Sequence, residues 1–163
     1  MTVTDELLAA NREYAESFSD GDKPMPPRRK VAVVACMDAR IDVYRALGLG
    51  LGEAHVIRNA GGVVTDDAIR SLVISQRLLG TEEIVLIHHS DCGMLTFSDD
   101  AVKQSIVDDT GLRPSFALES FGDVNADVTQ SIARVKANPF IPHKNVRGFV
   151  YDVDSGALSE VSS

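Results

Sequence analysis

The chain has 163 residues, 44% of them apolar and 25% charged, and its formal net charge at pH 7 is −8. This length suits one folded unit with a core of its own, so we expect residues 1–163 to form a single domain. The acidic charge disfavours nucleic acids and anionic membranes as partners, because both bind cationic surfaces. No apolar run approaches the roughly 18 residues that span a bilayer, and the first residues lack a secretory signal. We therefore expect a cytoplasmic location and no membrane partner.

Residues 1–27 are expected to form a helical arm followed by a proline-rich spacer. Thr4 can cap a helix whose apolar side carries Leu7, Tyr14 and Phe18. The prolines that follow cannot continue this helix and favour an extended chain. A helix separated from the body in this way needs a surface for its apolar side, either on its own core or on a second subunit.

After the spacer, apolar runs of strand length alternate with amphipathic helical segments. The runs lack strict alternation, which is typical of strands covered on both faces of a parallel sheet. A C-terminal pair of strands joined by a short turn predicts a hairpin. Together these patterns predict an α/β fold with a central, mostly parallel sheet flanked by helices, an antiparallel C-terminal edge strand and an N-terminal helical arm. The expected strands are residues 31–36, 54–59, 83–89, 146–153 and 157–161, and the expected helices include residues 65–79 and 124–135.

Candidate metal ligands follow two of the expected strands. Cys36 ends the first strand, and His89 and Cys92 stand at the end of the third. Ligands of such sheets bind beyond the carboxyl ends of the strands, where these side chains can converge. Two thiolates and one imidazole suit Zn²⁺, and three protein ligands leave a fourth position open, as in catalytic zinc sites. The alternative is a core cysteine and a hydrogen-bonded histidine, and the spacing alone does not decide between them.

Charged and glycine residues near these candidates extend the site. Arg40 can clamp the carboxylate of Asp38 in a bidentate pair, and that carboxylate can serve as a hydrogen-bond acceptor beside a zinc carrying two thiolates. The alternative for this pair is an exposed ion pair that caps a helix beginning near Ile41. Gly61 and Gly62 let backbone N–H groups approach a small ligand, or else form a tight turn between strand and helix.

Three segments together resemble the β-class carbonic anhydrases, in particular the short bacterial and mycobacterial members. The resemblance implies reversible hydration of CO₂ to bicarbonate and a proton, by attack of zinc-bound hydroxide. It also implies a homodimer whose N-terminal helices embrace the partner, and family members often pair such dimers into tetramers. The matching segments are Cys36-x-Asp38-x-Arg40, Arg58-Asn59-Ala60-Gly61 and His89-x-x-Cys92-Gly93.

The resemblance assigns a role to each residue of these segments. Cys36, His89 and Cys92 are implied as the ligands of one Zn²⁺ per chain. Asp38 and Arg40 are implied as the catalytic dyad. The backbone at Gly61 or Gly62 is implied as a hydrogen-bond donor to the substrate.

Other functions are compatible with parts of this pattern. The same scaffold resembles hydrolases of COS or CS₂, and the ligands and dyad do not separate these reactions, because hydroxide attacks a similar heterocumulene in each. A non-catalytic zinc-binding module needs no dyad, so the presence of Asp38 and Arg40 disfavours it. An unrelated nucleotide-binding α/β protein is disfavoured by the absence of a phosphate-binding loop motif.

Overall fold

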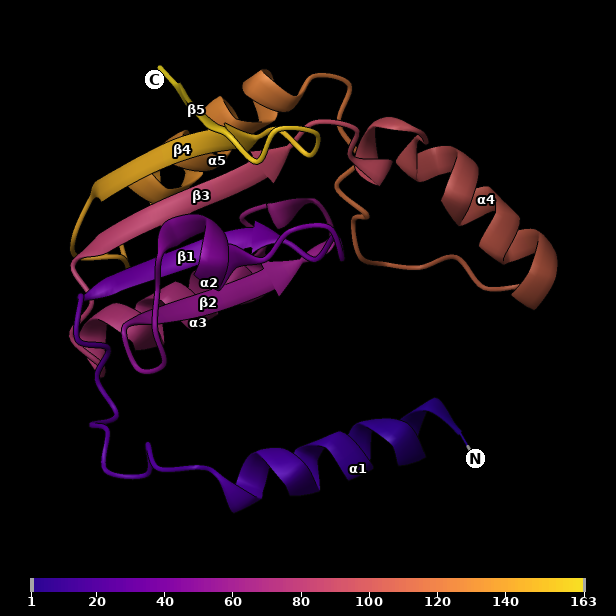
Figure 1. The fold of residues 1–163 in the computed structure, drawn as a ribbon. Coiled ribbons are helices and arrows are strands. Elements are labelled where there is room, and N and C mark those ends of the chain that lie inside the picture. Colours follow the sequence, from indigo (N-terminus) through magenta and orange to yellow (C-terminus); the bar gives the residue numbers. More distant parts are fainter. Residues whose placement is uncertain (1, 163) are drawn as a thin grey trace.

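The computed structural model describes residues 2–162 and has a five-stranded sheet at its centre (Figure 1). The strand order is β2-β1-β3-β4-β5; the first four strands are parallel and β5 runs antiparallel to β4. The expected fold class and the C-terminal hairpin are thereby confirmed. The strands are β1 (Val31–Cys36), β2 (Ala54–Asn59), β3 (Glu83–His89), β4 (Asn145–Tyr151) and β5 (Leu158–Val161).

Helical segments cover both faces of the sheet. On one face, Ala32 and Val34 of β1 pack with Leu72 of α3 and Ile132 of α5. The opposite face buries a second cluster that includes Val33 and lies against α2 and the segment after β3. Burial on both faces explains why the strands read as continuous apolar runs. The helical segments are α1 (Val3–Glu16), α2 (Val43–Leu47), η1 (Ala60–Gly62), α3 (Asp66–Arg77), η2 (Gly93–Leu95), α4 (Asp99–Thr110) and α5 (Val124–Ala137).

The strand register brings the ends of three strands to one edge of the sheet. Cys36, the last residue of β1, is opposite Asn59, the last residue of β2. On its other side, β1 pairs Ala35 with Ile87, and β3 then continues to His89. The carboxyl ends of β1, β2 and β3 therefore meet at one place, which is where ligands of parallel sheets bind.

Helix α1 stands apart from the body of the molecule (Figure 1). Its cap is Thr2 rather than the expected Thr4, because Thr2 and Asp5 form a reciprocal capping box. The Thr2 side chain accepts from the Asp5 amide at 3.3 Å, and the Asp5 carboxylate accepts from the Thr2 amide at 2.7 Å. No residue of α1 is buried. None of the described helices is both long and apolar enough to cross a membrane.

A buried glutamate fixes the chain where the arm joins the body. Glu53 is 7% exposed, and its carboxylate pairs with the guanidinium groups of Arg28 and Arg29. The backbone amide of Arg28 also donates to the carbonyl of Gly52 at 3.0 Å. The segment that follows the spacer is therefore held firmly, while α1 extends beyond it.

Candidate active site

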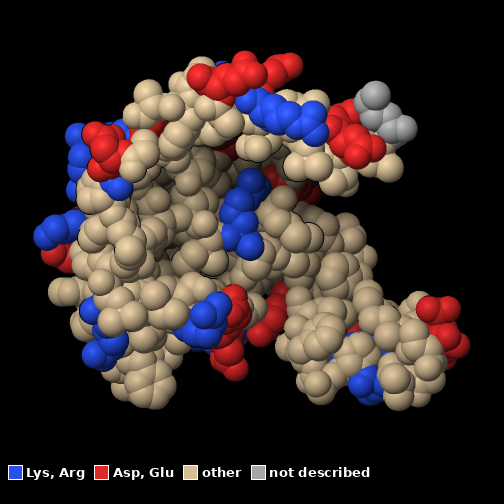
Figure 2. Space-filling model, turned by 90° about the horizontal axis from the view of Figure 1, so that it is seen from below, with Lys and Arg blue, Asp and Glu red and all other residues tan. Residues whose placement is uncertain are grey.

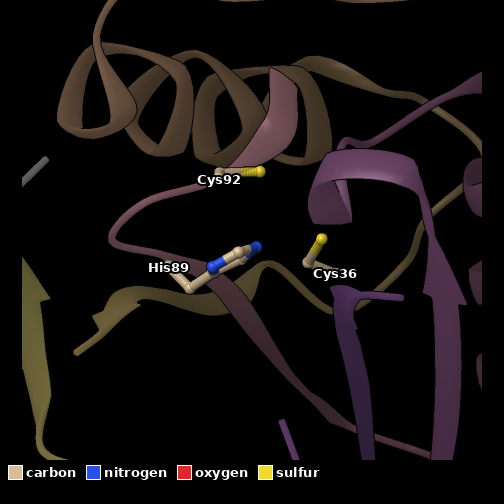
Figure 3. Close-up of side chains that lie close together, drawn as sticks. All are labelled: Cys36, His89 and Cys92. Carbon is tan, nitrogen blue, oxygen red and sulfur yellow. The ribbon is translucent and has the colours of Figure 1, made fainter. Parts of the chain in front are cut away.

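Cys36, His89 and Cys92 converge at the carboxyl edge of the sheet. Their ligand atoms all lie within 4.8 Å of one another, and all three residues are buried. Figure 3 shows the two sulfur atoms and the imidazole around one shared space. Cys36 comes from the end of β1, His89 from the end of β3, and Cys92 immediately precedes η2. The expectation that these strand ends meet is confirmed.

Backbone hydrogen bonds orient the imidazole. Nδ1 of His89 lies 2.8 Å from the carbonyl oxygen of Ser90, and since a carbonyl only accepts, Nδ1 carries the proton. Ser90 is itself held by the β4–β5 hairpin, because its amide donates to the Tyr151 carbonyl and its hydroxyl accepts from the Val153 amide. Nε2 of His89 is left fully buried, with a lone pair and no hydrogen-bond partner. An unpartnered imidazole nitrogen beside two thiols is what a metal ligand requires.

The two thiols also fit a cation. Burial raises the pKa of the Cys92 thiol to about 11, and the nearby Cys36 adds to that rise. Burial acts in the same direction on Cys36, but the neighbouring His89 imidazole and the amides of Asp38 and Gly61 outweigh it and lower the pKa of that thiol. Two buried thiolates repel each other unless a positive charge lies between them. A sulfur, sulfur and nitrogen donor set of this kind fits Zn²⁺.

Asp38 and Arg40 form a bidentate ion pair next to these ligands. Nε and Nη2 of Arg40 donate to the two carboxylate oxygens of Asp38 at 3.0 and 2.8 Å, and the Arg40 amide donates to Oδ1 at 2.8 Å. These bonds hold the pKa of the Asp38 carboxyl well below its usual range and raise the pKa of the Arg40 guanidinium. The pair does not cap the next helix, since Asp42 caps α2 by accepting from the Arg45 amide.

Arg40 has a second carboxylate partner that the sequence did not indicate. Its Nη1 donates to the carboxylate of Asp91 at 2.8 Å, and its Nη2 donates to the Asp91 carbonyl at 3.0 Å. The two residues are 51 positions apart in the chain. No local sequence pattern predicts a contact between residues so far apart in the chain. The contact forms because the ends of β1 and β3 lie next to each other.

The two glycines after β2 occupy different positions in the site. Gly61 lines the same cavity as Cys36, His89 and Cys92, which together form the candidate metal-ligating group. Gly62, with φ at +69°, lies against strand backbone: an added Cβ would be 2.7 Å from the Ile87 carbonyl oxygen and 2.8 Å from the Cys36 nitrogen. A side chain at Gly62 would therefore push the ends of β1 and β3 apart. Gly61 has φ at +82° and its added Cβ would contact Met94 at 3.0 Å.

A cavity of about 350 Å³ opens over the convergent ligands. Beside the ligands and Asp38, its walls include Ala60, Met94 and Phe97. Most of the exposed wall is therefore hydrocarbon. Such a chamber suits a small apolar molecule that reacts at a polar centre.

Comparison with known proteins decides the family. A family model described as carbonic anhydrase matches residues 31–158. Beta-carbonic anhydrase 1 of Mycobacterium tuberculosis is 61% identical over 163 residues, which cover 99% of each chain. The chain belongs to the β-carbonic anhydrase family. It is a carbonate dehydratase, a lyase that catalyses the reversible hydration of CO₂, and the family uses zinc.

Other relatives of this β-carbonic anhydrase include a solved structure with the same fold and a more distant hydrolase. The crystal structure of a carbonic anhydrase from Streptococcus mutans superposes with a TM-score of 0.93 and 43% identity, covering 99% of each chain. A carbon disulfide hydrolase from Saccharolobus solfataricus is more distant, at 38% identity over 180 residues, covering 94% of this chain and 86% of that protein. The resemblance seen in the sequence is thereby confirmed.

Proposed function

We propose that Cys36, His89 and Cys92 hold one zinc ion per chain and that Asp38 and Arg40 act beside it as the catalytic dyad for CO₂ hydration. The observation that carries this proposal is the position of the dyad. Oδ2 of Asp38 lies 3.8 Å from Nε2 of His89, so the clamped carboxylate borders the space that the three ligands share.

When bound, zinc supplies Lewis-acid chemistry that lowers the pKa of a water molecule, which can then attack CO₂. Asp38 serves that attack as a hydrogen-bond acceptor. Its Oδ2 receives one bond from Arg40 and keeps a further lone pair for the proton of the reacting water. Because Arg40 holds the pKa of Asp38 far below neutral, the carboxylate orients the water and does not store its proton.

The walls of the cavity supply the remaining binding groups. The backbone N–H of Gly61 faces the Cys36 sulfur, and both residues line the cavity. We propose Gly61 as the residue whose backbone contacts substrate, with Gly62 required beneath it for close packing against β1 and β3. The apolar side chains of Met94 and Phe97 then face the uncharged CO₂ molecule.

Stopped-flow measurement of CO₂ hydration by the zinc-loaded protein tests this function. The same preparation is assayed for hydrolysis of COS and CS₂, and its zinc content is measured. We expect hydration of CO₂ to be fastest by orders of magnitude, with one zinc per chain. Zinc-loaded protein that hydrolyses CS₂ and leaves CO₂ unaffected would instead support the function of the more distant relatives.

We also propose that the protein is a homodimer whose second copy covers α1. Leu7 and Tyr14 of α1, and Phe18 just beyond the end of α1 at Glu16, remain 66, 56 and 45% exposed. Figure 2 shows the face of the molecule on which α1 lies, where largely uncharged surface surrounds a basic side chain near the centre. Apolar side chains that stay exposed along a helix of this length are unfavourable in water. In a symmetric dimer, each subunit covers the apolar side of its partner's α1. Pairing of two such dimers would give a tetramer.

A cytoplasmic location is also proposed. Both cysteines of the chain are free and buried, and both belong to the metal-ligating group. Thiolate ligands survive best where the surroundings are reducing, as in the cytoplasm.

A further inference from the structure

Arg40 is shared between two carboxylates that approach it from different loops. Its Nε and Nη2 face Asp38, in the loop after β1. Its Nη1 and Nη2 also donate to Asp91. Asp91 lies in the loop between His89 and Cys92. The side chain of Arg40 is 46% exposed and that of Asp91 is 79% exposed, whereas that of Asp38 is only 18% exposed.

Asp91 presents two acceptors to the same guanidinium. Its carboxylate and its own backbone carbonyl accept from Arg40 at 2.8 and 3.0 Å. The backbone of Asp91 has φ at +52°, a left-handed conformation that Asp tolerates better than most residues. This turn points both acceptors toward Arg40, so the contact is more restrained than an ordinary surface ion pair.

We propose that Asp91 is a positioning residue for CO₂ hydration, holding the Arg40 guanidinium so that its Nε and Nη2 face Asp38. This inference rests on the proposed function of the dyad. An arginine side chain that is half exposed has several rotamers available, and a single partner leaves it free to turn away. The second anchor holds the guanidinium along its Nη1–Nη2 edge, which is next to the edge that faces Asp38.

Asp91→Asn tests the inference because it removes the charge, keeps the shape and suits a left-handed backbone. In the zinc-loaded protein we expect kcat for CO₂ hydration to fall about fivefold, because a neutral amide holds the guanidinium less strongly than a carboxylate does. Zinc content and circular dichroism should stay at parental values. Asp100→Asn is the matched control. Asp100 is an exposed aspartate of α4 whose carboxylate lies 2.7 Å from the guanidinium of Arg113. Its replacement should leave kcat within about twofold of the parental value.

A double-mutant cycle separates positioning from a general effect on the loop. If Asp91 acts through Arg40, Asp91→Asn has no effect on kcat once Arg40→Ala is present. An equal loss of kcat in both backgrounds would overturn the inference. If Asp91→Asn keeps the parental kcat while Arg40→Ala has a lower kcat, the positioning role of Asp91 is overturned and the proposed role of the dyad stands. Parental activity of Arg40→Ala would instead overturn the proposed role of the dyad, and the inference with it.

A nuclear magnetic resonance measurement gives a readout that does not depend on activity. The Nε–H of Arg40 donates to Asp38 and not to Asp91. Its exchange with water should become several-fold faster in Asp91→Asn, because the clamp on Asp38 opens more often. Unchanged exchange of this proton would show that Arg40 holds Asp38 without help from Asp91, which contradicts the inference.

Discussion

Oδ2 of Asp38 lies 3.8 Å from Nε2 of His89, so the carboxylate borders the space that Cys36, His89 and Cys92 share. Arg40 maintains this separation by engaging both oxygens of the carboxylate. A carboxylate freed from Arg40 would be an additional ligand for the metal and would close the site to water. We therefore propose that the ion pair would keep the fourth position of a bound metal open for substrate.

The metal-ligating role of His89 predicts a loss of zinc on substitution. His89→Gln removes the buried Nε2 donor, and we expect the variant to lose zinc to a weak chelator that leaves the parent loaded. His143→Gln, at an exposed histidine, is the control and should retain zinc. X-ray absorption of the parent should show two sulfur ligands at about 2.3 Å and one nitrogen at about 2.0–2.1 Å. Retention of one zinc per chain by His89→Gln would contradict the proposed ligand set.

Asp99 predicts a pH-dependent contribution to stability. Its carboxylate accepts from the amides of Ser120, Leu118 and Glu119 at 2.9, 2.7 and 3.2 Å, and these bonds, that of Ser120 foremost, lower its pKa to about 2. An unfolded aspartate titrates near pKa ~3.9. The contribution is thus complete above about pH 4 and is lost as the pH falls toward about 2.

Asp99→Asn should therefore be less stable than the parent near neutral pH, and the difference should shrink in acid. Urea denaturation of both proteins at about pH 6 and about pH 3 measures this, since effects common to both cancel in the difference. A difference between Asp99→Asn and the parent that stays constant with pH would rule out the assigned role.

The buried pair of His88 and Asp127 is expected to stabilise the fold. His88 lies in β3 and points to the opposite face of that strand from its neighbour His89. Nε2 of His88 lies 2.6 Å from the Asp127 carboxylate, and His88 is fully buried. Asp127→Ala leaves that nitrogen unpaired, so we expect the free energy of unfolding to fall by about 1–3 kcal/mol. Thermal and urea denaturation measure the change. Asp108→Ala, at an exposed position of α4, should stay within about 0.5 kcal/mol of the parent, and an equally small effect at Asp127 would contradict the prediction.

The exposed apolar side of α1 predicts that the arm is needed for assembly. Deletion of residues 1–22 should cause the dimer to dissociate or aggregate, because the surface that α1 covers on the partner becomes exposed. Sedimentation velocity over a range of concentrations distinguishes these states. Glu13→Gln, a change on the same helix that alters no apolar residue, should leave the dimer intact. A stable, active and monomeric truncated protein would contradict the proposed role of the arm.

Local patterns in the sequence were sufficient for most of the fold. The uninterrupted apolar run at residues 31–36 correctly predicts a strand buried on both faces, because burial of that kind leaves no polar positions. The turn at residues 154–156 correctly places the C-terminal hairpin. The cap of α1 was predicted at Thr4 and lies at Thr2, since either threonine has a suitable side chain and only the reciprocal bond with Asp5 selects one.

The candidate site was predictable where its residues share short motifs. Cys36, Asp38 and Arg40 fall within five positions, and their order with the later His89 and Cys92 carries the family resemblance. Contacts made across the fold were not predictable in the same way. The bond from Arg40 to Asp91 depends on a left-handed residue in one loop meeting a side chain from another, and neither loop contains a local signal for it.

The most direct test of the central claim is a stopped-flow comparison of CO₂ hydration by the parent and by Asp38→Asn, with zinc measured in both. We expect one zinc per chain in each protein and a kcat lower by a factor on the order of 10² in the variant, because Asn removes the charged acceptor that orients the reacting water. Asp100→Asn, prepared in parallel, should match the parent. A fully zinc-loaded Asp38→Asn protein that hydrates CO₂ at the parental rate would contradict the account.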